Sequence, residues 1–332
     1  MNKRVYGILG IASRMGNWNA DFTGYPKTIS SGEVFGSDKA FKYPMKKMWE
    51  QQGEKVLYIK SVKLQEKEVK KGNKKEIVVE LIPRSLKERY EYIFNEEDLK
   101  ESKDSKKVLE NLFSAIDVKN FGATFAEEGN NISITGAVQI GQGFNKYDET
   151  NAEEQQILSP FRDASEKPDK KKDKNNDEED EKKEAKASTL GSKIVSNEAH
   201  YFYPFTINPF AYNQFKELGV TKGYTEEDYK KFKEASLVAA TSFSTNSKIG
   251  CENEFALFVE TEPDLYLPDL SQYVDFQKEE DKNTIILKCD ELFNRLKDRI
   301  RNIEIYYNPY TTVIEADIEN AKKFNIFTKE EV

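Results

Sequence analysis

The sequence predicts an α+β fold in which helices cover an antiparallel sheet and long insertions interrupt the loops. Strand-like and helix-like segments mix without the regular β-α alternation of a doubly wound parallel sheet. A β-rich block with short turns lies between Asn120 and Tyr147. A chain of 332 residues can bury a substantial core, in one large domain or in two smaller ones.

The first half of the chain supplies strands, one well-marked helix and a charged region. Expected in order are a strand at 5–13, a polar loop at 16–36, a helix ending near Gln52, strands at 55–62 and 76–82, and a helix at 86–94. Ser37 or Asp38 caps the first helix and Gly53 stops it. Pro44 inside it predicts a kink or a late start. The charged region 63–107 favours an inserted subdomain.

The second half begins with the β-rich block and then changes composition sharply. Expected in order are strands at 123–126 and 132–140, a strand ending at Pro209, a helix at 225–240, a strand at 254–260, a helix at 287–300 and a final strand at 303–307. The run 161–188 holds ten acidic and nine basic residues and no aliphatic residue larger than alanine. It cannot bury a core, so we expect it to be disordered.

Composition narrows the function classes. Two cysteines and one histidine, without CxxC or HxxxH spacing, argue against a zinc site and a disulfide scaffold. No apolar run approaches the roughly 18 residues of a spanning helix, so we expect a cytoplasmic protein without membrane contact. The net charge of −8 combines +5 in residues 1–60 with −9 in residues 251–332. The basic region suits a polyanionic partner, and ordinary surface variation explains it equally well.

Lysines line one side of the predicted first helix, while Phe41, Met45 and Met48 lie on the other side. These lysines form either a solvated face or a surface that binds the phosphates of a nucleic-acid backbone. The preceding loop adds polar groups that suit phosphate or ribose. The candidates of this stretch are Asn17, Asn19, Ser37, Lys39, Lys42 and Lys46.

Three blocks of the sequence resemble the CRISPR-associated Cas-seven backbone proteins. The first is Asn17-Trp18-Asn19-Ala20-Asp21 followed by Pro26, Gly36-Ser37-Asp38 and Lys42; Tyr43 and Lys46 stand where the family often has arginine. The second is FGATF at 121–125 followed by ITGAVQ at 134–139, with Ala137 in place of a proline. The third is the Ser/Gly/basic loop 244–250 before a strand. The blocks keep the family's order and are most similar to its type I-B branch.

The resemblance implies a specific architecture. It implies an RRM-like (ferredoxin-like) antiparallel-sheet palm formed by residues 1–62, 106–147 and 199–332. A fingers-like insertion would occupy 63–105, and a thumb-like insertion would occupy 148–198 and contain the charged run 161–188.

The resemblance also implies a function. Such a protein polymerises along a guide RNA (crRNA) in a type I Cascade complex, contacts other Cascade subunits and presents the guide for pairing with target DNA. A protein that holds any guide sequence must grip phosphate and sugar rather than base edges. The implied RNA-binding set adds to the six candidates above Arg14, Gln139, Gln142, Asn145 and Lys248. Edge-strand polarity or a solvated turn explains several of these residues as well. No cofactor, metal or catalytic residue is expected.

Two alternatives remain open. Related backbone proteins cut target RNA with an aspartate in the region of Asp21, but a lone carboxylate without a companion histidine makes a poor nuclease. We therefore expect Asp21 to order the loop. The chain has no glycine after Gly250, which argues against processing of the guide. The other alternative is a general single-strand-binding protein. The aromatic run 201–205 could stack bases, although a half-buried strand with one exposed ring suits it better.

Overall fold

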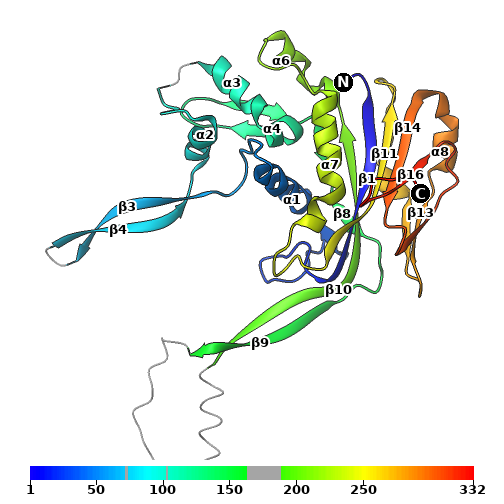
Figure 1. Ribbon diagram of the computed structural model, residues 1–332, viewed down its shortest axis with the longest axis horizontal. Coiled ribbons are helices and arrows are strands. Elements are labelled where there is room, and N and C mark those ends of the chain that lie inside the picture. The colour runs from blue at the N-terminus through cyan, green and yellow to red at the C-terminus, as the bar shows by residue number, and fades with distance from the viewer. Residues whose placement is uncertain (72–73, 102–103, 163–187) are drawn as a thin grey trace, which may run out of the picture.

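The computed structural model describes residues 1–71, 74–101, 104–162 and 188–332, and it is built around one large sheet. Within this part of the chain, nine strands join in the order β16-β14-β11-β1-β10-β8-β2, with β7 and β9 also paired to β10 (Figure 1). The central strand β1 pairs antiparallel with β10 on one side and with β11 on the other. The bounds are β1 Arg4–Gly16, β2 Phe35–Gly36, β7 Val138–Ile140, β8 Gly143–Asn145, β9 Ala152–Arg162, β10 Ser188–Ile207, β11 Cys251–Thr261, β14 Ile300–Tyr307 and β16 Lys322–Asn325.

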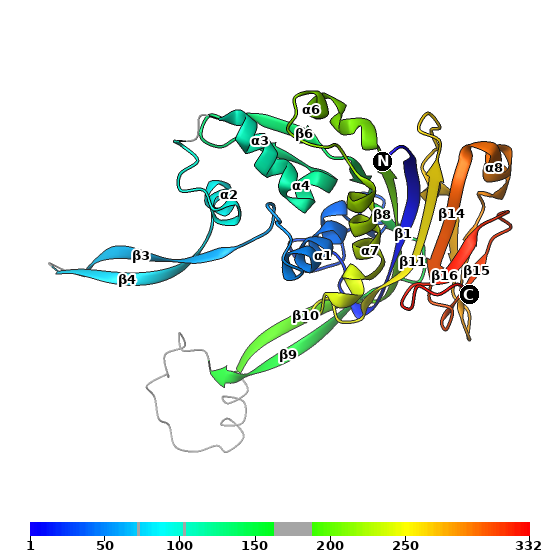
Figure 2. The ribbon, with the colours of Figure 1, turned by 45° about the horizontal axis from the view of Figure 1, so that its top comes forward.

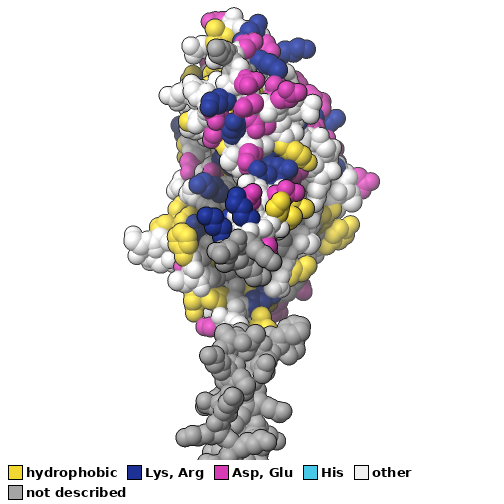
Figure 3. Space-filling model, turned by 90° about the vertical axis from the view of Figure 1, so that its left-hand side faces the viewer, with side chains coloured by type: hydrophobic (Ala, Val, Ile, Leu, Met, Phe, Trp, Pro, Cys, Tyr) yellow, Lys and Arg dark blue, Asp and Glu magenta, His cyan; other side chains and the backbone are white. Residues whose placement is uncertain are grey.

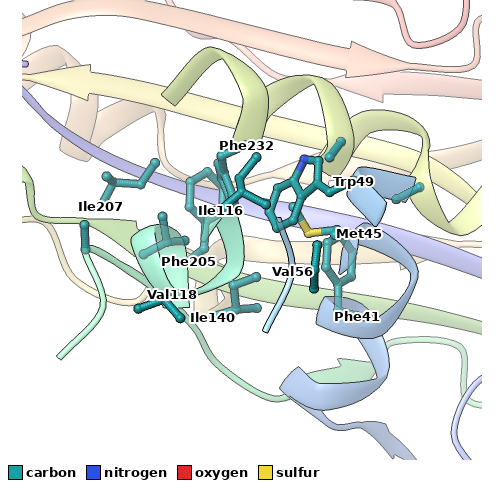
Figure 4. Packing of buried hydrophobic residues seen from close by; sticks show 14 of the residues in the cluster. Phe41, Met45, Trp49, Val56, Ile116, Val118, Ile140, Phe205, Ile207 and Phe232 are labelled. Carbon is teal, nitrogen blue, oxygen red and sulfur yellow. The ribbon is translucent and has the colours of Figure 1, made fainter. Parts of the chain in front are cut away.

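Both faces of this sheet are covered. Successive residues of a strand point to opposite faces, so Val5 and Leu9 of β1 enter one hydrophobic cluster and Tyr6 and Ile8 enter another. The helices α1 Asp38–Gln51, α4 Ile116–Phe121 and α7 Glu226–Ser242 pack on the first face (Figure 4). The helix α3 Ser105–Ser114 adds buried side chains to the same cluster. The second face is covered by η2 Leu270–Tyr273, α8 Asp290–Arg295 and a small sheet of β12 Val274–Gln277, β13 Asn283–Leu287 and β15 Thr312–Glu315. The predicted α+β class with antiparallel strands is therefore confirmed.

The helix α1 forms where the sequence predicts it. The Ser37 side chain accepts a hydrogen bond from the Ala40 amide (3.3 Å) and caps the first turn. Phe41, Met45 and Trp49 are buried on its inner side (Figure 4). The helix begins at Asp38, well before Pro44, so the alternative of a late start is wrong.

Two ribbons project from the body (Figures 1 and 2). One is the hairpin of β3 (Val62–Lys71) and β4 (Lys74–Pro83), which leads into α2 (Leu86–Phe94). The other is the arm formed by β9 and the first part of β10. They lie within the predicted insertions 63–105 and 148–198, whose assignment as fingers and thumb stays a prediction. The charged run 161–188 lies outside the described residues except at its two ends.

Several predicted elements are wrong in extent or type. Residues 55–61 form no strand, because the Leu57 and Tyr58 amides donate to the buried Asp117 carboxylate (2.8 Å each) instead of to a sheet neighbour. The single strand expected at 132–140 is interrupted between β6 (Ile132–Thr135) and β7. At that break Gly136 packs against backbone: a Cβ there would lie 2.2 Å from the Phe121 carbonyl carbon.

The C-terminal region also differs from the prediction. Leu287 ends β13, so the helix expected at 287–300 is reduced to α8 and the 3₁₀ turn η3 (Lys297–Arg299). The strand expected to be final, β14, is followed by β15 and β16. In the 201–205 run all four aromatic side chains are buried, so none offers a ring for stacking. The reason is that β10 is covered on both faces, a property that a periodicity of two does not report.

Candidate nucleic-acid interface

A basic and aromatic cleft opens between α1 and the hairpin of β5 (Gly122–Phe125) and β6. Its volume is about 660 Å³. Three lysines of α1 and the rings of Tyr43, Tyr58 and Phe121 contribute to its walls. The full set of lining residues is Asp38, Lys39, Lys42, Tyr43, Lys46, Tyr58, Phe121, Gly122, Ala123, Thr124 and Ile134. The cleft brings Lys39, Lys42 and Lys46 of α1 together with the FGATF segment of the second sequence block.

The three lysines differ in how firmly the protein holds them. Lys39 is exposed and pairs with no carboxylate among the residues that the structure describes. The Lys42 ammonium donates to Asp38 one turn earlier (2.9 Å) and lies 5.1 Å from the centre of the Phe121 ring. The Lys42 side chain is mostly covered, with 15% of it exposed, so a phosphate would compete with Asp38 for its ammonium. Lys39 can therefore meet phosphate without rearrangement, and Lys42 can do so by exchanging Asp38 for the phosphate.

Lys46 is tied to the 55–61 segment and to α4. Its ammonium donates to the Tyr58 carbonyl (3.2 Å) and lies 3.8 Å from an Asp117 carboxylate oxygen. Burial lowers the pKa of Lys46, and the Asp117 charge opposes that shift only in part. An anion entering the cleft would therefore stabilise a cation that the fold leaves undercompensated.

Two tyrosines shape the walls of the cleft. Tyr43 is exposed and is held by an edge-on contact with Phe243, with ring centres 5.5 Å apart. Tyr58 donates its hydroxyl to the Thr124 carbonyl (2.6 Å) and so ties the 55–61 segment to β5. Burial, and then the Asp117 charge, raise the pKa of Tyr58 to about 12, so this hydroxyl stays protonated. Tyr43 offers a ring face for base stacking at the place where the family often has arginine.

The polar residues of the opening loop brace the loop itself. The buried Asn17 amide donates to the carbonyls of Gly24 (2.8 Å) and Ile194 (3.2 Å). The Asn19 side chain accepts from the Ser37 amide (2.8 Å), while Ser37 caps α1. Asn17 thus braces the opening loop, while Asn19 and Ser37 fix the start of α1.

Asp21 also has a bracing geometry. One of its carboxylate oxygens accepts from the Thr23 amide (2.8 Å), the Thr23 hydroxyl (2.7 Å) and the Tyr25 amide (3.1 Å). The hydrogen bond from Thr23 is the main reason that the pKa of Asp21 is lowered. No group of three or more His, Cys, Asp or Glu side chains suited to a metal ion occurs among the residues that the structure covers. The arrangement is that of a hydrogen-bonded turn.

Lys248 locks two loops together. Its ammonium donates to the carbonyls of Asn17 (3.0 Å) and Trp18 and lies 4.9 Å from the centre of the Trp18 ring. Burial lowers the pKa of Lys248 to about 8. The 244–250 loop therefore lies against the opening loop, a long-range contact that the motif order did not predict. Lys248 would have to leave two carbonyls to meet a phosphate.

The other four predicted contacts lie outside the cleft. The Arg14 guanidinium faces Glu198 (3.1 Å) and Glu252 (3.6 Å). Gln139 pairs in register with Thr206, on the sheet face away from α1, and Gln142 is exposed between β7 and β8. Asn145 is hydrogen-bonded to Tyr147, Thr150 and His200. Of the eleven candidates, the cleft gathers Lys39, Lys42 and Lys46.

Sequence reasoning missed the far wall of the cleft. Phe121 and Thr124 belong to the FGATF block, whose motif does not reveal that it lies opposite α1. No sequence pattern indicated that Tyr58 lines a cleft, because the segment 55–62 was predicted to be a strand. A buried carboxylate, Asp117, holds that segment in place through two backbone amides.

Comparison with known proteins supports the resemblance. No helix in the described part of the chain is long and apolar enough to cross a membrane, and no curated protein matches the sequence. Among solved structures 87 chains match, one of them from "CRISPR RNA-guided surveillance complex, pre-nicking" with a TM-score of 0.50, 14% identity, and 97% and 96% of the two chains covered. That likeness concerns the fold. The family model described as CRISPR-associated protein Cas7 matches residues 3–292, and the chain therefore belongs to the CRISPR-associated protein Cas7 family.

Proposed function

We propose that this protein is a guide-RNA-binding backbone subunit of a type I CRISPR surveillance complex. The observation that carries the proposal is the cleft between α1 and β5–β6, in a chain that belongs to the family. Three lysines and two flanking tyrosines suit the backbone of a single strand. They present no arrangement of donors that would select one base, as a subunit holding any guide requires.

The finer role follows from the same reasoning. Copies of the chain line up along the crRNA, contact other Cascade subunits and leave the bases free to pair with target DNA. The protein acts in the cytoplasm, where guide and target meet. The subtype closest to its motifs is I-B.

We further propose that the subunit is not an enzyme. The carboxylate of Asp21 is engaged by three donors of its own turn, which suits loop bracing. A metal-dependent ribonuclease needs a metal or a general base beside that carboxylate. An assembled complex incubated with labelled target RNA and Mg²⁺ should leave the RNA intact, both with Asp21 and with Asp21→Asn. Cleavage that disappears in Asp21→Asn would replace this proposal with the ribonuclease alternative.

The decisive experiment for the function is the identity of the co-purified nucleic acid. The protein is expressed with its neighbouring subunits and a guide array, purified, and its bound RNA is sized and sequenced. A discrete short RNA of defined length is expected. Heterogeneous nucleic acid without guide sequence would instead identify a general single-strand-binding protein.

A further inference from the structure

The β9–β10 arm leaves the main sheet at one point. The strand β1 pairs with β10 as far as Gly16 and Ser196, and in the described part of the chain the residues of β10 before Ser196 pair only with β9. Figures 1 and 3 show the arm running down from the body, apart from the β3–β4 hairpin. A ribbon of two strands has no third strand to hold its course. The direction of the arm therefore depends on what contacts its root.

Asn17 reaches the arm where β1 ends. The register would place residue 18 opposite Ile194 if β1 continued past Gly16. The chain turns away instead into the opening loop between β1 and β2. The Asn17 side-chain amide then donates one hydrogen bond to the Ile194 carbonyl (3.2 Å) and a second to the Gly24 carbonyl of the loop (2.8 Å). A single residue, only 5% exposed, thus joins the opening loop to the arm.

The turn at 21–25 of the opening loop contacts both strands of the arm. The Tyr25 hydroxyl donates to the Glu154 carboxylate of β9 (3.3 Å). Gly24 has a positive φ of 91°, and a Cβ at this position would lie 3.4 Å from the Cδ1 atom of Ile194 on β10. The Ile194 side chain therefore lies against the backbone of the turn. Asp21 stiffens the turn from inside through its three hydrogen bonds.

The opening loop is itself held firmly. The Trp18 indole donates to the Tyr203 hydroxyl (2.5 Å), and the Lys248 ammonium donates to two carbonyls of the loop. The Asn19 side chain accepts from the Ser37 amide (2.8 Å) at the start of α1. The arm thus rests on a support that is fixed both to the sheet and to the helix that carries the cleft lysines.

The opening loop supplies the hydrogen bonds that connect the arm to the body. Within the part of the chain that the structure describes, the hydrogen bonds between the body and the arm beyond Ser196 come from Asn17 and Tyr25. Asn151 and Asn197 bond to each other, which joins the two strands at the base of the arm. The Tyr25 contact is exposed to solvent, whereas Asn17 is buried, so we expect Asn17 to contribute more.

We propose that Asn17 is a positioning residue that sets the direction of the β9–β10 arm. It supports the arm where β1 no longer runs beside β10, and Gly24 and Tyr25 complete the support. Because the opening loop also fixes the start of α1, the arm keeps a constant direction relative to the lysines of the cleft. The inference goes beyond the proposed function, because it concerns the free protein and does not depend on the ligand of the cleft.

Distances between spin labels test this support in the free protein. Nitroxide labels are attached through Gln155→Cys on β9 and Gln272→Cys on η2. Both positions are exposed, while the two native cysteines are buried, so labelling is selective. Double electron–electron resonance should give one narrow distance distribution with Asn17 in place, and one at least about twofold broader in Asn17→Ala. An unchanged distribution in folded Asn17→Ala would overturn the proposal.

A matched control separates positioning from a general loss of stability. Asn120 is fully buried in α4, where its side chain makes two hydrogen bonds (2.8 and 2.7 Å). Asn120→Ala should lower the unfolding midpoint and keep the narrow distribution, and equal broadening in this variant would also overturn the proposal. If Asn17→Ala does not fold, the variant Tyr25→Phe/Ile194→Ala removes the other contacts and decides in its place. Its distribution should broaden, and a width equal to that of wild type would contradict support of the arm by the opening loop.

Discussion

Replacement of Lys39 and Lys42 in the cleft tests the proposed contact with RNA most sharply. Each lysine that neutralises a phosphate of a single strand adds about 0.7 to the slope of log affinity against log salt. Lys39 is exposed and unpaired within the described chain, so Lys39→Gln should lower the slope by the full amount. Lys42 already pairs with Asp38 at 2.9 Å and exchanges one anion for another, so Lys42→Gln should lower it by less.

The same relation gives the expected affinities. Counted from 1 M salt, where the contact contributes nothing, a slope of 0.7 means that loss of one contact lowers the affinity about eightfold at 50 mM salt and about threefold at 200 mM. The double variant Lys39→Gln/Lys42→Gln should therefore lose between about eightfold and about sixtyfold at 50 mM, and clearly less at 200 mM. The measurement is fluorescence anisotropy of a labelled poly-uridine RNA over a salt series.

A matched control is Lys297→Gln, which removes an exposed lysine near α8, on the other side of the sheet. It should leave both slope and affinity unchanged. The reasoning is refuted if the folded double variant keeps the wild-type slope. A fall in affinity by the same factor at every salt concentration would also refute it, because the lysines would then act through the shape of the cleft.

Three further predictions concern the scaffold. The pKa of Lys248 is lowered to about 8 by burial, so the unfolded chain holds the extra proton between pH 8 and 10.5. The stability of wild type relative to Lys248→Met should therefore rise across that interval, by up to about 3 kcal/mol in urea titrations. Gly36→Ala should cost at least about 2 kcal/mol in the same assay, because the new Cβ would lie 1.8 Å from the Tyr203 hydroxyl oxygen, whereas Gly191→Ala should be neutral. Burial alone would lower the pKa of His200, but the Glu254 and Glu198 carboxylates outweigh it and raise that pKa. The imidazolium thus stabilises the fold below pH 6.5, and this contribution should fade as pH rises through the raised pKa; pH-dependent unfolding of His200→Gln should lack this part of the curve.

Local signals were sufficient for elements whose stability is local. The helix α1 is set by its Ser37 cap and its buried inner side, and α2 by its own capping box, so both begin where the sequence predicts. The strand predicted at 55–62 does not form over 55–61, because the distant Asp117 carboxylate accepts the backbone amides that a strand would use. Hydrophobic pattern cannot reveal such a tertiary partner.

In the candidate site, too, local signals predicted some features, whereas tertiary contacts decided the others. The spacing of Lys39, Lys42 and Lys46 indicated a common face, and helical geometry was enough to bring them together. Asn17 and Lys248 were predicted from residue type alone, and in the structure both side chains donate to carbonyls of neighbouring loops. Residue type alone does not tell a group that contacts a ligand from one that braces the contact.

The bracing residues explain how a few lysines can act as a grip. The Asp117 carboxylate, whose two oxygens accept backbone amides at 2.8 Å, stays 3.8 Å from the Lys46 ammonium and compensates its burial only in part. Lys46 is therefore a cation fixed in place, buried and undercompensated. A phosphate in the cleft supplies the missing charge, and the gain depends on charge and position but not on the base. Since Asn19 fixes the start of α1 through the Ser37 amide, the lysine face is preorganised for any sequence of the strand.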